Sequence, residues 1–183
     1  MYEIYSKITL NMLNTIETER LFLRPFRIGD EVAMFKNWTT DERVAEYCKW
    51  HPHKSIEETK QYLDMCINAD YCLAITLNGG NDETIGAVDL VGKNDNGAYE
   101  IGYVLMHDYW GKGIMTEAVR AVIKCLFDRG FNKLAAKHHV NNPASGRVLE
   151  KCGMKYVGNS VSQKKFGSEE LCEVKCYEIT KKE

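Results

Sequence analysis

The sequence lacks the long apolar run that a membrane-spanning helix requires. No stretch of its 183 residues approaches the roughly 20 apolar residues that cross a bilayer. The first residues also lack the basic, then apolar, then small-residue order that marks a signal peptide. We therefore expect a soluble, cytoplasmic protein with no membrane partner.

A strong excess of charge of either sign is missing too. The formal net charge is -2, so the chain as a whole has no field that would draw it to nucleic acid. The two lysine pairs, Lys164-Lys165 and Lys181-Lys182, are short runs of the kind that solvated surfaces carry. Nucleic acid is therefore not expected as a partner.

The spacing of potential metal ligands is also absent. None of the seven cysteines forms a Cys-x-x-Cys pair, and Cys172 and Cys176 lie four apart in a predicted strand. The odd number of cysteines and their scatter through apolar stretches favour buried free thiols in a reducing compartment. His51 and His53 have no third ligand at a useful spacing. We expect no metal ion.

The composition indicates one α+β domain. Hydrophobic residues make up 44% and charged residues 27% of the chain, which is typical of globular proteins, and there are no repeats or linkers. The predicted order is strand, two helices, three strands, helix, strand, helix and two strands. This order predicts a single domain with a mixed, mostly antiparallel sheet of about seven strands, flanked by helices on both faces. Residues 1–14 show no clear period and are predicted to be an extension before a domain of residues 15–183.

A glycine-rich segment at residues 109–118 points to anion binding. It follows an alternating apolar run at residues 99–106 and opens a helical pattern that continues to Asp128. Gly111 and Gly113 would let the backbone approach an oxyanion, and the first amides of a helix have no internal partners. These amides and the helix dipole favour a phosphate or pyrophosphate. An ordinary tight turn is the alternative, whereas the Rossmann and Walker glycine patterns do not match.

Four segments together resemble the GNAT-fold acyltransferases, and specifically the branch that contains the bacterial ribosomal-protein N-alpha-acetyltransferases. They are Thr-Glu-Arg-Leu-Phe-Leu-Arg-Pro-Phe at 18–26, Tyr-Glu-Ile-Gly-Tyr-Val-Leu at 99–105, Trp-Gly-Lys-Gly-Ile-Met-Thr-Glu-Ala at 110–118, and Asn-Pro-Ala-Ser through Glu-Lys-Cys-Gly-Met at 142–154. The resemblance runs from about residue 16 to residue 179. It implies acetyl-CoA as the cofactor and direct acetyl transfer to an amine.

The resemblance also implies a set of cofactor-binding residues. In this family the strand before the loop splays away from the next strand and pairs with the pantetheine arm, here through the backbone of Tyr103, Val104 and Leu105. The backbone amides of the loop would hold the pyrophosphate. These loop residues are Gly111, Lys112, Gly113, Ile114, Met115 and Thr116. Asn142, which the sequence also predicts as a helix N-cap, would bind the pantetheine or acetyl region.

The catalytic residues follow from the same resemblance. Glu100 is expected as the general base, with an ordinary solvated strand carboxylate as the alternative. Ser145 is expected to protonate the departing thiolate, since the ribosomal-protein branch uses a serine at this position; many other members place a tyrosine where this chain has Leu149. The position of the carboxylate that is assigned as base in that branch corresponds here to Gln163-Lys164-Lys165, which contains no acidic residue. Unless they face solvent, these lysines would repel a cationic amine.

The acceptor is the least determined part of the prediction. Residues 47–53 and the C-terminal hairpin are expected to form its side of the site. A peptide N-terminus, a polyamine, an aminoglycoside or a small metabolite could serve, and the absence of a strongly acidic cluster favours a peptide N-terminus or a small metabolite. A non-catalytic regulator that binds acyl-CoA is the alternative function. Edge strands and the hairpin could also pair two chains into a homodimer.

Overall fold

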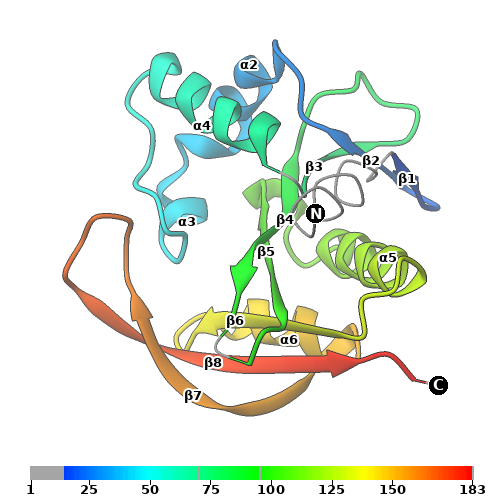
Figure 1. Ribbon diagram of the computed structural model, residues 1–183. Coiled ribbons are helices and arrows are strands. Elements are labelled where there is room, and N and C mark those ends of the chain that lie inside the picture. Colours follow the sequence, from blue (N-terminus) through cyan, green and yellow to red (C-terminus); the bar gives the residue numbers. More distant parts are fainter. Residues whose placement is uncertain (1–14, 70, 95, 183) are drawn as a thin grey trace, which may run out of the picture.

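The computed structural model describes residues 15–69, 71–94 and 96–182, and the predicted extension of residues 1–14 lies outside these residues (Figure 1). The described strands form one sheet in the order β1-β2-β3-β4-β5-β6-β8-β7. Their bounds are β1 Ile16–Glu17, β2 Leu21–Pro25, β3 Cys72–Leu77, β4 Gly86–Lys93, β5 Tyr99–Leu105, β6 Lys133–His139, β7 Lys155–Gln163 and β8 Leu171–Thr180. The helical segments are α2 Asp30–Met34, the π-turn η1 Phe35–Thr39, α3 Glu42–Ala45, α4 Ile56–Asn68, the 3-10 turn η2 His107–Tyr109, α5 Ile114–Asp128 and α6 Pro143–Lys151.

The strand pairing confirms a mixed, mostly antiparallel sheet. Every neighbouring pair in the described sheet is antiparallel except β5 and β6, which are parallel. The sheet has eight strands, one more than the sequence predicts, because the two residues of β1 pair with β2 through Ile16 and Leu23. A strand this short carries no alternating pattern that a sequence could display.

Two helices begin at residues whose side chains cap them, and the second of these residues, Asn142, is the cap that the sequence predicts. The Ser55 hydroxyl accepts a hydrogen bond from the amide of Glu58 at 3.3 Å, and the Glu58 carboxylate accepts one from the amide of Lys54 at 2.8 Å. Asn142 caps α6, since its side-chain oxygen accepts a hydrogen bond from the amide of Ser145 at 3.2 Å. These bonds satisfy amides that the helices themselves leave unpaired.

A hydrophobic core lies on each face of the sheet. Because side chains alternate along a strand, β5 turns Ile101 toward α5 and α6 and turns Val104 toward α2 and α4. The first core includes the fully buried Leu126 and Leu149, and the second includes the fully buried Trp38. Figure 1 shows α2 and α4 together at one end of the molecule, with α5 apart from them. The prediction of helices on both faces is confirmed.

The sheet opens between β5 and β6. Their parallel ladder contains only the pairs Tyr99 with Leu134 and Glu100 with Ala135. Beyond Glu100 the strands diverge, and Figure 1 shows β5 continuing toward α4 while β6 runs across the molecule beside β8. The rest of β5 therefore has a neighbour only on its β4 side, as the family resemblance implies.

Two expectations about composition can be checked against the fold. The seven cysteines are all free, and Cys66, Cys72 and Cys152 are buried. In the part of the chain that the structure describes, no helix combines the length and the apolar character needed to cross a membrane.

Candidate functional site

The glycine-rich segment forms a turn that leads directly into α5. Gly111 and Gly113 have φ angles of 72° and 77°, a left-handed conformation that side chains disfavour. Gly113 is the N-cap of α5 and has no side chain to cap the helix, so the amides of Ile114, Met115 and Thr116 point out of the helix end without an internal partner. This geometry suits an anion at the positive end of the helix dipole.

Arg20 braces this turn, a role that the sequence did not reveal. Its guanidinium donates to the carbonyl oxygen of Lys112 at 3.0 Å and forms an ion pair with Glu117 at 2.6 Å. One of its nitrogens lies 3.6 Å from the point where a Cβ on Gly113 would be. The turn therefore has a fixed cation beside it as well as free amides. Arg20 lies far from the turn in sequence, at the start of β2, so no local pattern links the two.

The backbone of β5 presents free polar groups to the opening in the sheet. The carbonyl of Val104 points toward Gly86 of β4, and successive residues of a strand direct their backbone groups to opposite sides. Tyr103 and Leu105 therefore face the opening, whereas Val104 does not. The Leu105 carbonyl already accepts a hydrogen bond from the Trp110 indole nitrogen at 2.8 Å. The amide and carbonyl of Tyr103 and the amide of Leu105 remain for an added strand-like ligand.

Two hydroxyl groups meet across the opening. The Tyr103 phenol on β5 lies 2.7 Å from the Ser145 hydroxyl on α6 and donates to the Ser145 carbonyl at 3.0 Å. Burial raises the pKa of the Tyr103 phenol, so it stays protonated at neutral pH. Leu149, which stands where many GNAT enzymes have a tyrosine, is fully buried in the core. The phenol of Tyr103 nevertheless reaches α6, although Tyr103 belongs to β5 and not to the helix itself.

Glu100 lies at the last rung of the ladder between β5 and β6, on the sheet face covered by α2 and α4. Its carboxylate forms an ion pair with Lys137 of β6 at 3.0 Å, and the residue is only 9% exposed. The expectation of an ordinary solvated strand carboxylate is therefore wrong. The ion pair fixes the carboxylate at the point where the strands diverge.

The two elements expected on the acceptor side contact each other. The Lys165 ammonium, in the β7–β8 hairpin, donates to the carbonyls of Ala45, Cys48 and Trp50 at 2.6, 2.8 and 3.0 Å. Lys164 forms an ion pair with Glu170 at 2.7 Å. Carbonyl or carboxylate oxygens of this chain thus bind both lysines. Lys165 in this way holds the hairpin to the end of α3 and the segment that follows it.

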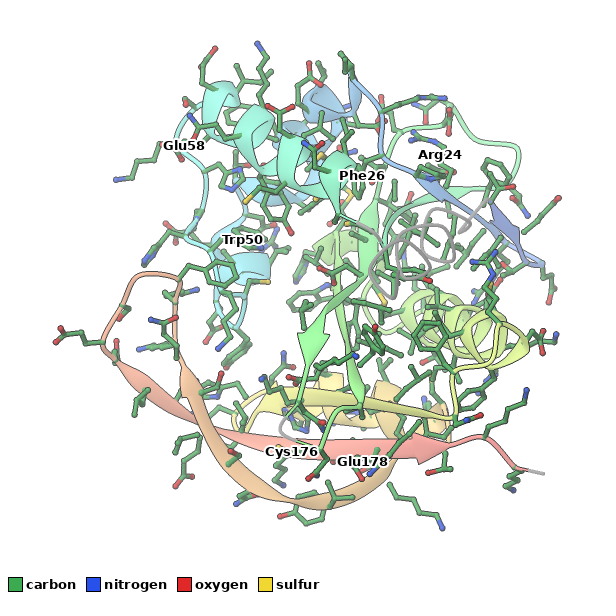
Figure 2. All side chains as sticks on the ribbon, viewed as in Figure 1. Arg24, Phe26, Trp50, Glu58, Cys176 and Glu178 are labelled. Carbon is green, nitrogen blue, oxygen red and sulfur yellow. The ribbon has the colours of Figure 1, made fainter. Side chains whose placement is uncertain are left out.

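A cavity of about 270 Å³ lies where this segment meets α4 and the hairpin. Figure 2 shows Trp50 on the loop below α4, and Glu58 near the start of that helix. The cavity is lined by Trp50, His51, His53, Glu58, Gln61, Tyr62, Met65 and Phe166. The loop and the hairpin that the sequence assigns to the acceptor side thus line an open hollow together with α4.

The histidines do not form a metal site. His53 is buried, with its Nδ1 2.9 Å from the Thr59 hydroxyl, and burial lowers its pKa. His138 is buried against α6, where its Nε2 lies 2.7 Å from the point that a Cβ on Gly146 would occupy. No group of three metal-ligating side chains occurs in residues 15–69, 71–94 and 96–182.

Asp89 of β4 is a second carboxylate on the face that carries Glu100, and the sequence analysis missed it. It lies opposite Gly102 in the β4–β5 ladder, and burial raises its pKa to about 6. An aspartate inside a strand is conspicuous in sequence, because strands are depleted in this residue. The sequence alone does not show what this aspartate is near, because the register of β4 and β5 is what places Asp89 opposite Gly102.

Comparisons with known proteins agree with this geometry. The "uncharacterized N-acetyltransferase p20" of Bacillus licheniformis is 32% identical over 149 residues, which cover 75% of this chain and 80% of that protein. A GNAT-family acetyltransferase structure from Bacillus anthracis has a TM-score of 0.79 and 26% identity, and covers 91% of this chain and 98% of its own. The structure of RimL, a ribosomal L7/L12 alpha-N-protein acetyltransferase in complex with coenzyme A, has a TM-score of 0.73 and 22% identity, with coverage of 91% and 98%.

These similarities match the elements that build the site. Residues 20–155 match the acetyltransferase (GNAT) domain. This range runs from Arg20, which lies beside the glycine turn, through β5, α5 and α6. Since the match covers most of the chain and agrees with the fold and the p20 relative, the chain belongs to the GNAT acetyltransferase family.

Proposed function

We propose that this protein is an acetyl-CoA-dependent N-acetyltransferase that acts on a primary amine, either a peptide N-terminus or a small amino compound. The observation that carries the proposal is the opening between β5 and β6, which lies beside both the glycine turn and the Tyr103–Ser145 pair. A cofactor strand, a phosphate cradle and a proton donor thus occur at one place in the fold. Acetyl-CoA supplies the activated acetyl thioester.

The residues of the opening fit the two parts of coenzyme A. The free amide and carbonyl of Tyr103 and the amide of Leu105 could pair with the amides of the pantetheine arm. Val104 would contribute through its position in β5 rather than through its own backbone groups. The amides of residues 111–116, including those of Lys112 and Met115, would receive the pyrophosphate, and Arg20 would add a positive charge. The coenzyme A in the RimL structure supports this assignment.

The Tyr103–Ser145 pair could return a proton to the departing thiolate. The serine hydroxyl lies in the first turn of α6 and would give its proton to the thiolate; the phenol would turn its O–H from the Ser145 carbonyl to the serine oxygen, pass its proton on, and take one back from solvent water. Asn142 holds this turn in place through its hydrogen bond to the Ser145 amide, which leaves its amide nitrogen free for the cofactor. The Tyr103 phenol thus supplies the hydroxyl group that many GNAT enzymes have on a tyrosine at the position of Leu149.

Glu100 is the proposed general base. An acceptor amine must lose a proton before it can attack the thioester, and Glu100 lies where β5 and β6 separate. Lys137 keeps the carboxylate in one position and would leave its second oxygen for a water molecule or the amine. An acceptor could reach this point from the side enclosed by α4 and the hairpin.

Calorimetry with acetyl-CoA, followed by thiol release against peptides, monoamines, polyamines and aminoglycosides, tests the proposal. We expect binding and turnover with at least one amine class. The variants Glu100→Gln and Ser145→Ala should keep acetyl-CoA affinity and lose turnover. Binding without turnover on any amine would support the acyl-CoA-binding regulator instead, and no binding would refute the assignment of the glycine turn.

A further inference from the structure

Asp89 lies on the same face of the sheet as the proposed base. It pairs across the ladder with Gly102, and Gly102 is two residues from Glu100 along β5. Because side chains two apart in a strand point to the same face, Asp89 and Glu100 are diagonal neighbours. The face is the one that α2 and α4 cover, since Ala87 and Val104 belong to the core on that side. Asp89 therefore lies one strand away from the opening, over Gly102 of β5, on the face that also carries Glu100.

The absence of a side chain on Gly102 makes room for this carboxylate. A Cβ at Gly102 would lie 2.5 Å from an Asp89 carboxylate oxygen and 2.8 Å from a Val91 methyl carbon. The carboxylate thus rests on the backbone of β5. Val91 beside it is 59% exposed. A carboxylate and an exposed apolar group share one small surface.

The Asp89 carboxylate has no cationic partner among the described residues. Burial raises its pKa to about 6, and its own backbone amide is the one group that lowers it. The titratable groups that interact with it from the packed elements are Tyr62 of α4, Cys48 after α3 and Cys72 of β3, and their raised pKa values keep all three uncharged. Glu100, by contrast, has Lys137. A buried carboxylate without a partner is costly, and a ligand with a positive charge would remove that cost.

The neighbouring lysines limit how many charges such a ligand can carry. The positive charges of Lys137 and Lys165 both lower the pKa of Lys49, so these three ammonium groups lie in one region of the acceptor side. Lys137 is paired with Glu100, whereas Lys49 and Lys165 contact a hydroxyl or carbonyls and no carboxylate among the described residues, so these two would repel a ligand with several positive charges. One ammonium at Asp89, attached to an apolar body that contacts Val91 and Tyr62, fits the charges better.

We propose that Asp89 is the specificity-determining residue that binds the ammonium of the acceptor, and that the acceptor class is a monoamine with an apolar body. This inference rests on the proposed function, because the amine that Asp89 binds would be the amine that is acetylated beside Glu100. A charge-assisted hydrogen bond from the ammonium to Asp89 would hold the amine beside Glu100.

Amine binding to the protein–coenzyme A complex tests this directly, because that complex cannot turn over. We would titrate the complex with 2-phenylethylamine by calorimetry at about pH 7.5 and about pH 5, on either side of the Asp89 pKa of about 6. Wild type should bind more tightly at the higher pH. Asp89→Asn should bind at least about tenfold more weakly at the higher pH and lose the pH dependence, a change that corresponds to one lost charged contact.

Two further variants separate recognition from general damage. Gly102→Ala should weaken amine binding because its methyl group displaces the Asp89 carboxylate. Asp64→Asn, on the exposed surface of α4, should behave as wild type. All variants should keep the wild-type affinity for coenzyme A. Spermidine should bind no more tightly than 2-phenylethylamine.

The outcomes distinguish this inference from the proposed function. Wild-type amine affinity in Asp89→Asn, pH-independent binding, or no amine binding to the complex would overturn the role of Asp89, even if acetyl transfer to another acceptor were observed. Asp89-dependent amine binding without acetyl transfer to any amine of the panel would leave the recognition role intact and count against the proposed acetyl transfer.

Discussion

Replacement of Asp89 by asparagine should stabilise the folded protein at neutral pH. The Asp89 carboxylate is partly shielded from water and has no compensating cation among the described residues, so the folded state disfavours its charge. Asparagine has nearly the same shape and no charge. The substitution therefore removes an electrostatic penalty while it preserves the packing against Gly102.

The size and the sign of the effect follow from the pKa. Burial raises the Asp89 pKa from 3.8 to about 6 in the folded protein, so the folded state binds the proton more tightly than the unfolded chain. The free energy of unfolding therefore falls as the pH rises from about 4 to about 6, and the loss is complete above that range. Two pKa units correspond to about 3 kcal/mol at pH 7.5, and the same linkage gives about 1 kcal/mol at pH 4.5.

Urea unfolding of wild type and Asp89→Asn at these two pH values measures the difference. The gain in the free energy of unfolding should be larger at the higher pH by about 2 kcal/mol, although hydrogen bonding by the new amide could reduce both gains equally. Asp64→Asn controls for general effects of charge removal, because that residue is exposed. An equal change at both pH values would refute the claim that Asp89 is an unpaired carboxylate shielded from water.

Three other substitutions probe the rest of the site. Gly113→Val should weaken acetyl-CoA binding by about tenfold or more, since its backbone has φ 77° and must approach the phosphates; unchanged affinity in calorimetry would mean that the cradle is misplaced. Tyr103→Phe should lower kcat for thiol release and leave acetyl-CoA affinity unchanged, and equal losses in both would argue against a proton relay to Ser145. Lys165→Met should raise the acceptor KM and lower the free energy of unfolding by about 1–3 kcal/mol, because three carbonyls lose their donor; an unaltered KM would separate the hairpin from the acceptor.

Local chemistry explains why much of the fold could be predicted from the sequence. The Ser55 and Asn142 caps use side chains within three residues of the amides that they bind, and the start of α5 follows directly from Gly113. Long helices with an apolar face, such as α5, display their period in the sequence itself. Each of these features needs only neighbouring residues, so a single sequence contains all of the required information.

The parts that could not be predicted depend on which strands meet and in what register. Tyr103 and Ser145 are 42 residues apart, and nothing near either residue indicates their contact. Lys165 was expected to repel a cationic amine unless it faced solvent, but carbonyls after α3, 115 to 120 residues away, occupy its ammonium. In both cases the missing information is a distant partner rather than a residue property.

The charges on the acceptor side show why this missing information matters for function. Glu100 and Lys137 neutralise each other, Lys164 is matched by Glu170, and Lys165 is surrounded by carbonyls. The Asp89 carboxylate is left without a charged partner among the described residues, diagonal to Glu100, the proposed base. If that carboxylate had only a structural task, a neutral side chain would perform it with less loss of stability. An acid at this position is therefore best explained by a positive charge that the protein itself does not provide, and the ammonium of the proposed acceptor is such a charge.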